Sequence, residues 1–122
     1  MEINKVNLAD KLGTFSEYWS PKIVAELNGQ QVKLAKLQGE FVWHHHEHED
    51  ELFHVLAGEL FIELRDQQTL RLLPGECVVI PRGVEHKPNA PEEVHVLLFE
   101  PATTLNTGNI ANERTVADLE KI

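Results

Sequence analysis

The amino-acid sequence predicts an all-β fold, a β-barrel or sandwich of short strands with one short helical turn near the N-terminus. Short apolar or alternating segments follow one another closely between residues 22 and 99, and Gly, Pro and Asn-Gly separate them. Long segments with helical periodicity do not alternate with these strands, which excludes a parallel α/β sheet. Many short strands at close spacing are typical of antiparallel sandwiches and barrels.

The N-terminal residues predict one or two turns of helix. Asn7 can cap this helix through its side chain, Asp10 lies in the first turn, where the helix dipole favours negative charge, and Gly13 ends it. Three aromatic residues follow at Phe15, Tyr18 and Trp19. We expect this aromatic cluster to pack either over an open end of the core or against a second subunit.

From residue 22 the pattern changes to strands. Lys22–Leu27 is followed by Asn28-Gly29, the strongest hairpin signal in the chain, and by a return strand over residues 31–38. Alternation over residues 59–65 places Leu60, Ile62 and Leu64 on one face. Further strands are expected over residues 69–73, 78–80 and 94–99, with turns at 66–68 and 81–83. The tail after residue 101 is predicted to be irregular, and residues 115–121 either form a helical turn or stay loose.

The composition limits the class of protein. A chain of 122 residues is most simply one domain, and a formal net charge of −9 argues against binding a nucleic-acid backbone, which needs clustered Lys and Arg. The single cysteine, Cys77, excludes an internal disulfide and is expected to be a small buried hydrophobe. The N-terminus lacks a signal-peptide pattern, and no apolar run approaches the ~18 residues of a membrane helix. We therefore expect a cytoplasmic protein without nucleic-acid or membrane partners.

A histidine-rich stretch lies in the middle of the chain. Residues 39–58 contain five of the seven histidines, interleaved with acidic residues and bounded by glycines. Neutral imidazole and carboxylate groups are the ligands of divalent transition metals. A histidine tag would lie at a terminus, whereas this stretch continues into an apolar, strand-like segment. We therefore predict a metal site at the mouth of a β structure, although the role of His48, in a loop, stays open.

Strand geometry sorts the other histidines of this stretch. In an extended chain His44 and His46 point to one face and His45 to the other. Glu51 follows after a polar turn and can return to the same place from the next strand, whereas His54 lies on the face opposite Glu51. We therefore expect His45 to face solvent or to support a ligand, and His54 to be a packing or surface residue.

The spacing of these residues resembles the two signatures of the cupin superfamily. The first is His44-x-His46, then four residues, Glu51, six residues and Gly58; the second is Gly75, then five residues, Pro81-x-Gly83, two residues and His86. The sixteen residues between Gly58 and Gly75 resemble those of small single-domain bacterial cupins, a group similar to mannose-6-phosphate isomerases. The resemblance implies a cupin-type jelly roll, or double-stranded β-helix. It would be a single domain over residues 1–122, with its core at about 22–100 and extensions at 1–21 and 101–122.

Two positions depart from the family pattern. Gly39 is one residue closer to the first histidine than usual, and Ala90 stands where an asparagine usually follows the last histidine by four. Asn89 lies one residue too early for that role. We interpret Asn89 as a turn residue, and neither departure affects a metal ligand.

Carried over residue by residue, the resemblance makes His44, His46, Glu51 and His86 the ligands of one divalent transition metal ion per chain. Three neutral imidazoles and one carboxylate leave one or two coordination positions for water or substrate, and Zn, Mn, Fe, Ni and Co all accept this set. The turn of Pro81 and Gly83 would present His86.

Other residues near the two motifs have two possible roles each. Trp43, Phe53 and Phe61 are candidates either for the pocket wall or for plain core packing. The acidic residues Glu47, Glu49, Asp50 and Glu85 are expected to be solvated charges, unless one of them serves as an acid or base.

Two classes of function agree with such a site. The first is a metal-dependent enzyme acting on a small organic molecule, either a dioxygenase or an isomerase/epimerase; the second is a non-catalytic module that binds or senses a small ligand. Basic residues do not cluster near the predicted core, so we rank sugar phosphates below neutral or weakly anionic substrates. The aromatic and aliphatic N-terminal segment predicts a homodimer.

Overall fold

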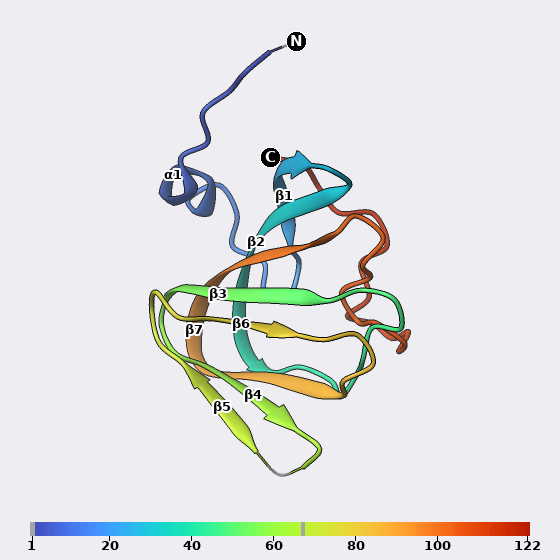
Figure 1. Ribbon diagram of the computed structural model, residues 1–122. Helices are drawn as coiled ribbons and strands as arrows, with labels where there is room; N and C mark the ends of the chain where they lie inside the picture. Colours follow the sequence, from blue (N-terminus) through green and yellow to red (C-terminus); the bar gives the residue numbers. More distant parts are fainter. Residues whose placement is uncertain (1, 67) are drawn as a thin grey trace.

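The computed structural model describes residues 2–66 and 68–122 and is built almost entirely of antiparallel strands (Figure 1). Within these residues its elements are α1 (Leu8–Leu12), β1 (Lys22–Leu27), β2 (Gln30–Glu40), β3 (Glu51–Ala57), β4 (Leu60–Leu64), β5 (Thr69–Leu72), β6 (Cys77–Ile80) and β7 (His86–Pro101). Each of the paired strands is antiparallel to its partner. The all-β prediction with a short N-terminal helix is therefore confirmed.

Strand β7 joins the two parts of the sheet. Its C-terminal half lies between β2 and β3 in the order β1-β2-β7-β3-β6, while its N-terminal half pairs with β4, which also pairs with β5. In Figure 1 the β4–β5 hairpin extends from one end of the molecule, beyond β3 and β6. The core lies between these strands and includes Val55, Leu60, Ile62, Val94 and Val96, each with 0% of its surface exposed.

Several local signals of the sequence are confirmed. The Asn7 side chain accepts a hydrogen bond from the backbone N–H of Asp10 at 3.0 Å, and the helix ends before Gly13. Asn28 and Gly29 have φ values of 50° and 76°, as the two-residue turn between β1 and β2 requires. Leu60 and Ile62 lie in the core, and Leu64 packs against it.

Three local predictions are wrong. Cys77 is exposed, because alternation along the edge strand β6 turns Ile80 inward and Cys77 outward. Asn89 is not a turn residue but lies within β7, opposite Phe61 of β4 and Glu40 of β2. Strand β7 is also longer than the strand predicted over residues 94–99. It begins at His86, where the alternation of buried and less buried residues already starts.

The two terminal segments pack along β1 and β2. The backbone N–H of Trp19 donates to the Lys36 carbonyl at 2.9 Å, and that of Ile122 donates to the Ile23 carbonyl at 3.0 Å. The C-terminal end therefore lies beside β1, while residues 2–7 extend away from the barrel (Figure 1). Residues 115–121 form no helix, and they are not loose either, because Lys121 forms a bridge with Ile23 and the Ile23 N–H donates to the Glu120 carbonyl at 2.9 Å. Neither of the two alternatives for this segment is therefore correct. Across residues 2–66 and 68–122, no helix is long and apolar enough to span a membrane.

Candidate metal centre

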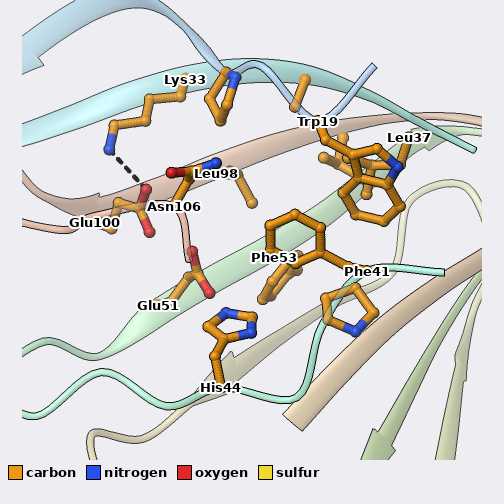
Figure 2. Close-up of a pocket in the computed structure, with 14 residues that line it drawn as sticks. Trp19, Lys33, Leu37, Phe41, His44, Glu51, Phe53, Leu98, Glu100 and Asn106 are labelled. Atoms are coloured by element: carbon orange, nitrogen blue, oxygen red, sulfur yellow. Dashed lines mark hydrogen bonds and ion pairs between the residues drawn. The ribbon is translucent and has the colours of Figure 1, made fainter. Parts of the chain in front are cut away.

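Four buried side chains meet inside the barrel. The ligand atoms of His44, His46, Glu51 and His86 lie within 4.8 Å of one another. At most 4% of the surface of each residue is exposed. Figure 2 shows His44 and Glu51 directed toward the same cavity. The structure thus brings together the four residues that the sequence selected.

Backbone hydrogen bonds hold the two motifs against each other. His44 and His86 exchange backbone N–H and carbonyl groups at 3.1 and 2.9 Å, and the Gly83 N–H donates to the His46 carbonyl at 2.8 Å. Gly83 has a φ of 81°, which is the conformation expected for the turn before His86. Glu51 is the first residue of β3, so its side chain enters the same space from a third direction.

The imidazole rings present lone pairs to the centre of the cluster. Nδ1 of His44 lies 2.9 Å from the Val42 carbonyl, and Nδ1 of His86 lies 2.9 Å from the Val84 carbonyl. Carbonyl oxygens only accept, so each Nδ1 carries the proton and each Nε2 is left with a lone pair. Hydrogen bonds of this kind from the second ring nitrogen are typical of metal-binding histidines.

The centre of the cluster contains buried nitrogen and oxygen atoms that have no hydrogen-bond partner among the described residues. Nε2 of His46 and of His86 lie 3.4 and 3.5 Å from Glu51 Oε1, yet none of these three atoms forms a hydrogen bond with any described residue. Buried polar atoms are rarely left without a partner, because the loss of hydration costs free energy. A divalent cation would satisfy all of them, so the donor set and its geometry fit a transition metal ion.

Electrostatics favour the protonation states that bind metal. Burial, together with the neighbouring His86, lowers the pKa of His44 to about 4. Burial by itself would raise the pKa of Glu51, but the neighbouring side chains of Glu100, His46 and His86 hold this pKa well below its usual value. At neutral pH His44 therefore offers a neutral imidazole and Glu51 an ionised carboxylate.

The histidines excluded by strand parity lie outside this cluster. His45 points away from it, with Nε2 2.6 Å from Glu47 and Nδ1 3.4 Å from Glu85, and hydrogen bonding to Glu47 raises its pKa. His48 is exposed, and His54 is half-buried on the opposite side of β3 from Glu51. His45 and His54 therefore lie outside the cluster, as strand parity predicted.

The acidic loop residues make surface contacts. Asp50 accepts a hydrogen bond from the Arg82 backbone N–H at 2.8 Å, and Glu49 accepts one from the Thr103 hydroxyl at 2.7 Å. Together with Glu47 and Glu85, they do not line the cavity beside the cluster. The interpretation of these four residues as loop charges agrees with the structure.

An apolar cavity borders the cluster at His44 and Glu51. Its cavity volume is about 40 Å³. Its wall is formed largely by apolar side chains, namely Trp19, Pro21, Ala35, Leu37, Phe41, Phe53, Pro88, Val96 and Leu98. Trp19 and Phe41 stack with ring centres 4.6 Å apart and planes 12° apart (Figure 2). The cavity therefore has a mainly apolar, partly aromatic wall beside the cluster.

The prediction of the aromatic wall was only partly correct. Phe53 lines the cavity, whereas Trp43 and Phe61 do not, and Trp43 instead lies under the Arg65 guanidinium at 4.0 Å. Trp19 and Phe41 were missed as wall residues. Trp19 belongs to the N-terminal aromatic cluster, for which packing over an open end of the core was one of the two expectations. Phe41 precedes the first histidine by three residues, a spacing that strand parity assigns to the opposite face, so this signal did not indicate it.

One end of the cavity is polar. Lys33 of β2 and Glu100 of β7 form an ion pair with Nζ and Oε1 2.7 Å apart, and their side chains are only 1% and 2% exposed. Burial and the nearby negative charge of Glu51 raise the pKa of Glu100 well above its usual value. Asn106, from the C-terminal segment, lines the same cavity. No local pattern in the sequence indicates this polar end.

The C-terminal segment also supports the histidine motif. The Asn109 side chain accepts a hydrogen bond from the His45 N–H at 2.9 Å, and the Asn109 N–H donates to the His45 carbonyl at 3.0 Å. A Cβ atom added to Gly108 would lie 2.2 Å from the His45 carbonyl oxygen and 3.0 Å from the His44 ring. Glycine is therefore required here, where the tail packs directly against the residue between two of the candidate ligands.

An antiparallel barrel with three histidines and a glutamate gathered inside it could hold a metal ion, and comparison with known proteins identifies the family. The model of the cupin domain matches residues 28–100. The chain therefore belongs to the cupin family, which confirms the resemblance inferred from the two motifs.

Individual relatives agree with this assignment. The structure is similar to that of a cupin-2 domain containing protein from Shewanella frigidimarina NCIMB 400, with 50% identity, a TM-score of 0.77, and coverage of 79% of this chain and 93% of that one. It is also similar to protein NMB1881 from Neisseria meningitidis, with 29% identity, a TM-score of 0.75, and coverage of 81% and 100%. Among curated sequences, "Uncharacterized protein YdbB" of Bacillus subtilis (strain 168) is 44% identical over 64 residues, which are 52% of this chain. The match spans 57% of the length of that relative.

Proposed function

We propose that this cupin binds one divalent transition metal ion per chain through His44, His46, Glu51 and His86, and that it acts on a small organic molecule as a metal-dependent enzyme. The reaction would be that of a dioxygenase or of an isomerase/epimerase. The observation that carries the proposal is the convergence of four buried ligand side chains at the border of an apolar cavity. Structural metal sites are usually closed by protein ligands, whereas catalytic sites keep an open position.

The residues of the chain have separate roles in this proposal. A bound ion would supply Lewis-acid polarisation or oxygen activation. The carbonyls of Val42 and Val84 orient the rings of His44 and His86 through their Nδ1 protons. The stacked Trp19 and Phe41 would bind the apolar part of a ligand and exclude water from it.

The charges of the cavity support a neutral or weakly anionic substrate. Lys33 is the one basic residue among the described residues that line the cavity, and Glu100 already pairs with it at 2.7 Å. A phosphate group would need several convergent basic side chains or a free one. The described residues that line the cavity include no unpaired lysine or arginine, which argues against a sugar phosphate as the substrate. The resemblance to mannose-6-phosphate isomerases therefore concerns the fold and not the substrate.

The second candidate is a non-catalytic module that binds or senses a small ligand. The observation that favours it is the composition of the cavity wall, which is apolar except at the cluster and at its polar end. An isomerase or epimerase needs an acid or base in contact with its substrate. A binding module needs only the metal and the apolar wall.

A turnover screen of metal-loaded protein separates these candidates. Oxygen consumption would be followed with an oxygen electrode, and isomerisation by proton NMR under argon, over a panel of small aromatic, hydroxylated and keto compounds. The proposal expects turnover by at least one compound, which a chelator abolishes and added metal restores. Saturable binding of ligands without turnover would favour the binding module. A metal-loaded protein that neither binds nor converts any compound would contradict both candidates.

We also propose that the chain forms a homodimer. Exposed apolar side chains near the N-terminus support this, since Ile3 is 93% exposed and Tyr18 is 42% exposed. Light scattering of the full chain at micromolar concentration should give twice the mass of one chain. A monomeric mass would contradict this proposal and leave the metal site unaffected.

A further inference from the structure

The cavity beside the metal cluster is too small for the ligand that the proposed function needs. Its volume is about 40 Å³, which is room for roughly three water molecules. Pockets that bind small organic molecules usually enclose about 300–1,000 Å³. An organic molecule can therefore occupy the cavity beside His44 and Glu51 only if part of its wall moves.

Most of the wall belongs to the sheet, but its N-terminal part does not. Ala35 of β2 and Val96 of β7 are direct partners in the sheet, so they cannot separate unless the strand pairing breaks. Trp19 and Pro21 lie instead in residues 16–21, which we call the N-terminal strap. The strap precedes β1 and forms no strand of its own. It can therefore move while the sheet stays intact.

A few hydrogen bonds near Trp19 tie the strap to the barrel. The Trp19 backbone N–H donates to the Lys36 carbonyl at 2.9 Å, and its indole Nε1–H donates to the Gln38 carbonyl at 2.9 Å. The Tyr18 hydroxyl donates to the Glu93 carboxylate at 2.6 Å. A hydrogen bond at the surface contributes little net stability, because water replaces it when it breaks. Local opening of the strap therefore costs less free energy than unfolding of the sheet.

Trp19 itself adopts a strained backbone conformation. Its φ is 59°, in the left-handed region, which bulky residues adopt only at a cost in free energy. Strain of this kind concentrates at ligand clamps and switch regions. The Trp19 side chain is half-buried, and its ring stacks on Phe41 at one side of the cavity, away from Glu100 (Figure 2). Release of Trp19 would relieve the strain and open the cavity at the same place.

We propose that Trp19 is the gate of the metal site and that it selects ligands by size. The strap lifts the Trp19 ring from Phe41 to admit an organic ligand, and the ring then closes over the apolar part of that ligand. The hydrogen bond between Tyr18 and Glu93 holds the gate closed. This inference rests on the proposed function and names the residue that controls access to its metal. Ligands of a few atoms reach the metal with the gate closed, whereas a ring has to wait for the gate to open.

Two carboxylates of different size test the gate. Formate and benzoate bind a metal through the same group, and only benzoate carries a ring. Each would be mixed in a stopped-flow spectrometer with the full chain loaded with Co²⁺, whose visible spectrum reports binding. We expect the observed rate for formate to rise linearly with concentration. The rate for benzoate should level off at the opening rate of the gate.

Substitution of the gate should remove this limit. In Trp19→Ala the benzoate rate should stay linear and exceed the wild-type limit at least about tenfold, because no ring blocks the path. The matched control is Trp43→Ala, which removes the other tryptophan of the chain, outside the cavity wall, and should keep the wild-type limit. Tyr18→Phe should raise the limit by about fivefold, because the hydrogen bond to Glu93 is lost.

Hydrogen exchange gives a second readout, which needs no metal. In NMR spectra of the metal-free chain, the Trp19 indole N–H should be at least about 100-fold less protected than the backbone N–H of Val96 in the core, because local opening is easier than global unfolding. Tyr18→Phe should speed exchange at Trp19 by about fivefold. The control Arg71→Met, which removes an exposed ion pair of 2.7 Å with Glu59, should leave it unchanged.

The outcomes separate this inference from the proposed function. Equal protection of Trp19 and Val96, or a linear benzoate rate in the wild type that Trp19→Ala does not change, would overturn the gate and leave the metal site in place. A chain that takes up no Co²⁺, or whose Co²⁺ spectrum responds to neither carboxylate, would contradict the proposed function. Hydrogen exchange would then still decide whether the strap opens at Trp19.

Discussion

Two polar clusters lie in the same barrel interior, and they differ in how the chain assembles them. His44, His46, Glu51 and His86 come from two short motifs at the turns between strands, and backbone hydrogen bonds join those motifs. Lys33 and Glu100 lie 67 residues apart on β2 and β7 and meet only because those strands pair. The first cluster has the donor set of a metal site, whereas the second is a buried ion pair. A local sequence motif can encode the first cluster, whereas the second cluster forms only because two distant strands pair.

The largest effect is expected from removing a ligand of the first cluster. His86→Ala should weaken metal binding by well over about 100-fold, since loss of a supporting residue alone typically costs 10–100-fold. Isothermal titration with Zn²⁺ would measure this. The control is His95→Ala on the same strand, whose side chain is partly exposed and contacts Glu93 at 2.6 Å. Similar affinities of the two variants would show that His86 is not a ligand.

The second cluster should respond to single and double substitution in opposite ways. Lys33→Met alone leaves the buried Glu100 carboxylate without its partner and should lower the free energy of unfolding by about 3–5 kcal/mol. Lys33→Met/Glu100→Leu should restore most of this loss, because apolar residues replace the whole pair. Urea unfolding of the metal-free protein would measure both.

The exposed Lys121–Glu26 pair provides the control for this comparison. Lys121→Met should change the free energy of unfolding by less than about 1 kcal/mol, as is usual for surface ion pairs. If the two single lysine variants had the same small effect, the Lys33–Glu100 pair would not be buried in solution.

The first cluster should also make the metal-free protein sensitive to acid. His44 has a pKa of about 4 in the folded protein, against an ordinary value of 6.5, so the unfolded chain binds more protons at this residue between these pH values. The stability that depends on neutral His44 is therefore present above pH ~6.5 and is lost as the pH falls toward 4.

Between pH 7 and pH 5 the free energy of unfolding should fall by on the order of 2 kcal/mol from this residue. Urea unfolding of the metal-free protein at the two pH values would measure the change. The variant His44→Phe should show a smaller decrease than the wild type. An equal decrease in both proteins would contradict the assigned neutral state.

A further effect on stability is expected from the tail that supports the first cluster. Gly108→Ala would place a Cβ atom 2.2 Å from the His45 carbonyl oxygen at a φ of 58°, and should cost about 1–3 kcal/mol of stability. The control is Gly75→Ala, because φ is also positive there, at 88°, but no atom lies within 4 Å. Thermal unfolding of both variants would measure the difference. Equal destabilisation would show that the tail does not pack against the histidine motif.

The sequence was informative where neighbouring residues determine the outcome. Asn28-Gly29 predicted the β1–β2 hairpin, and alternation over β4 predicted the burial of Leu60 and Ile62. Strand parity also separated His44 and His46 from His45, because the alternation of side chains needs no knowledge of tertiary contacts.

Other features depend on contacts between distant segments and were not accessible in this way. The burial of Lys33 depends on which face of β2 turns inward, and its pairing with Glu100 depends on the register with β7. The exposure of Cys77 follows from the edge position of β6, which its short apolar sequence does not reveal. Trp19 reaches the cavity through a backbone with a φ of 59° that no local pattern indicated.

Metal stoichiometry tests the central claim most directly. The full chain would be stripped with a chelator, dialysed against Zn²⁺ or Co²⁺ and analysed by plasma mass spectrometry beside the variants His46→Ala and His45→Ala. We expect about one equivalent per chain for the wild type and for His45→Ala, and a large loss for His46→Ala, because only His46 offers its ring to the buried cluster. A wild-type chain without metal, or full retention of metal by His46→Ala, would contradict the proposed metal site.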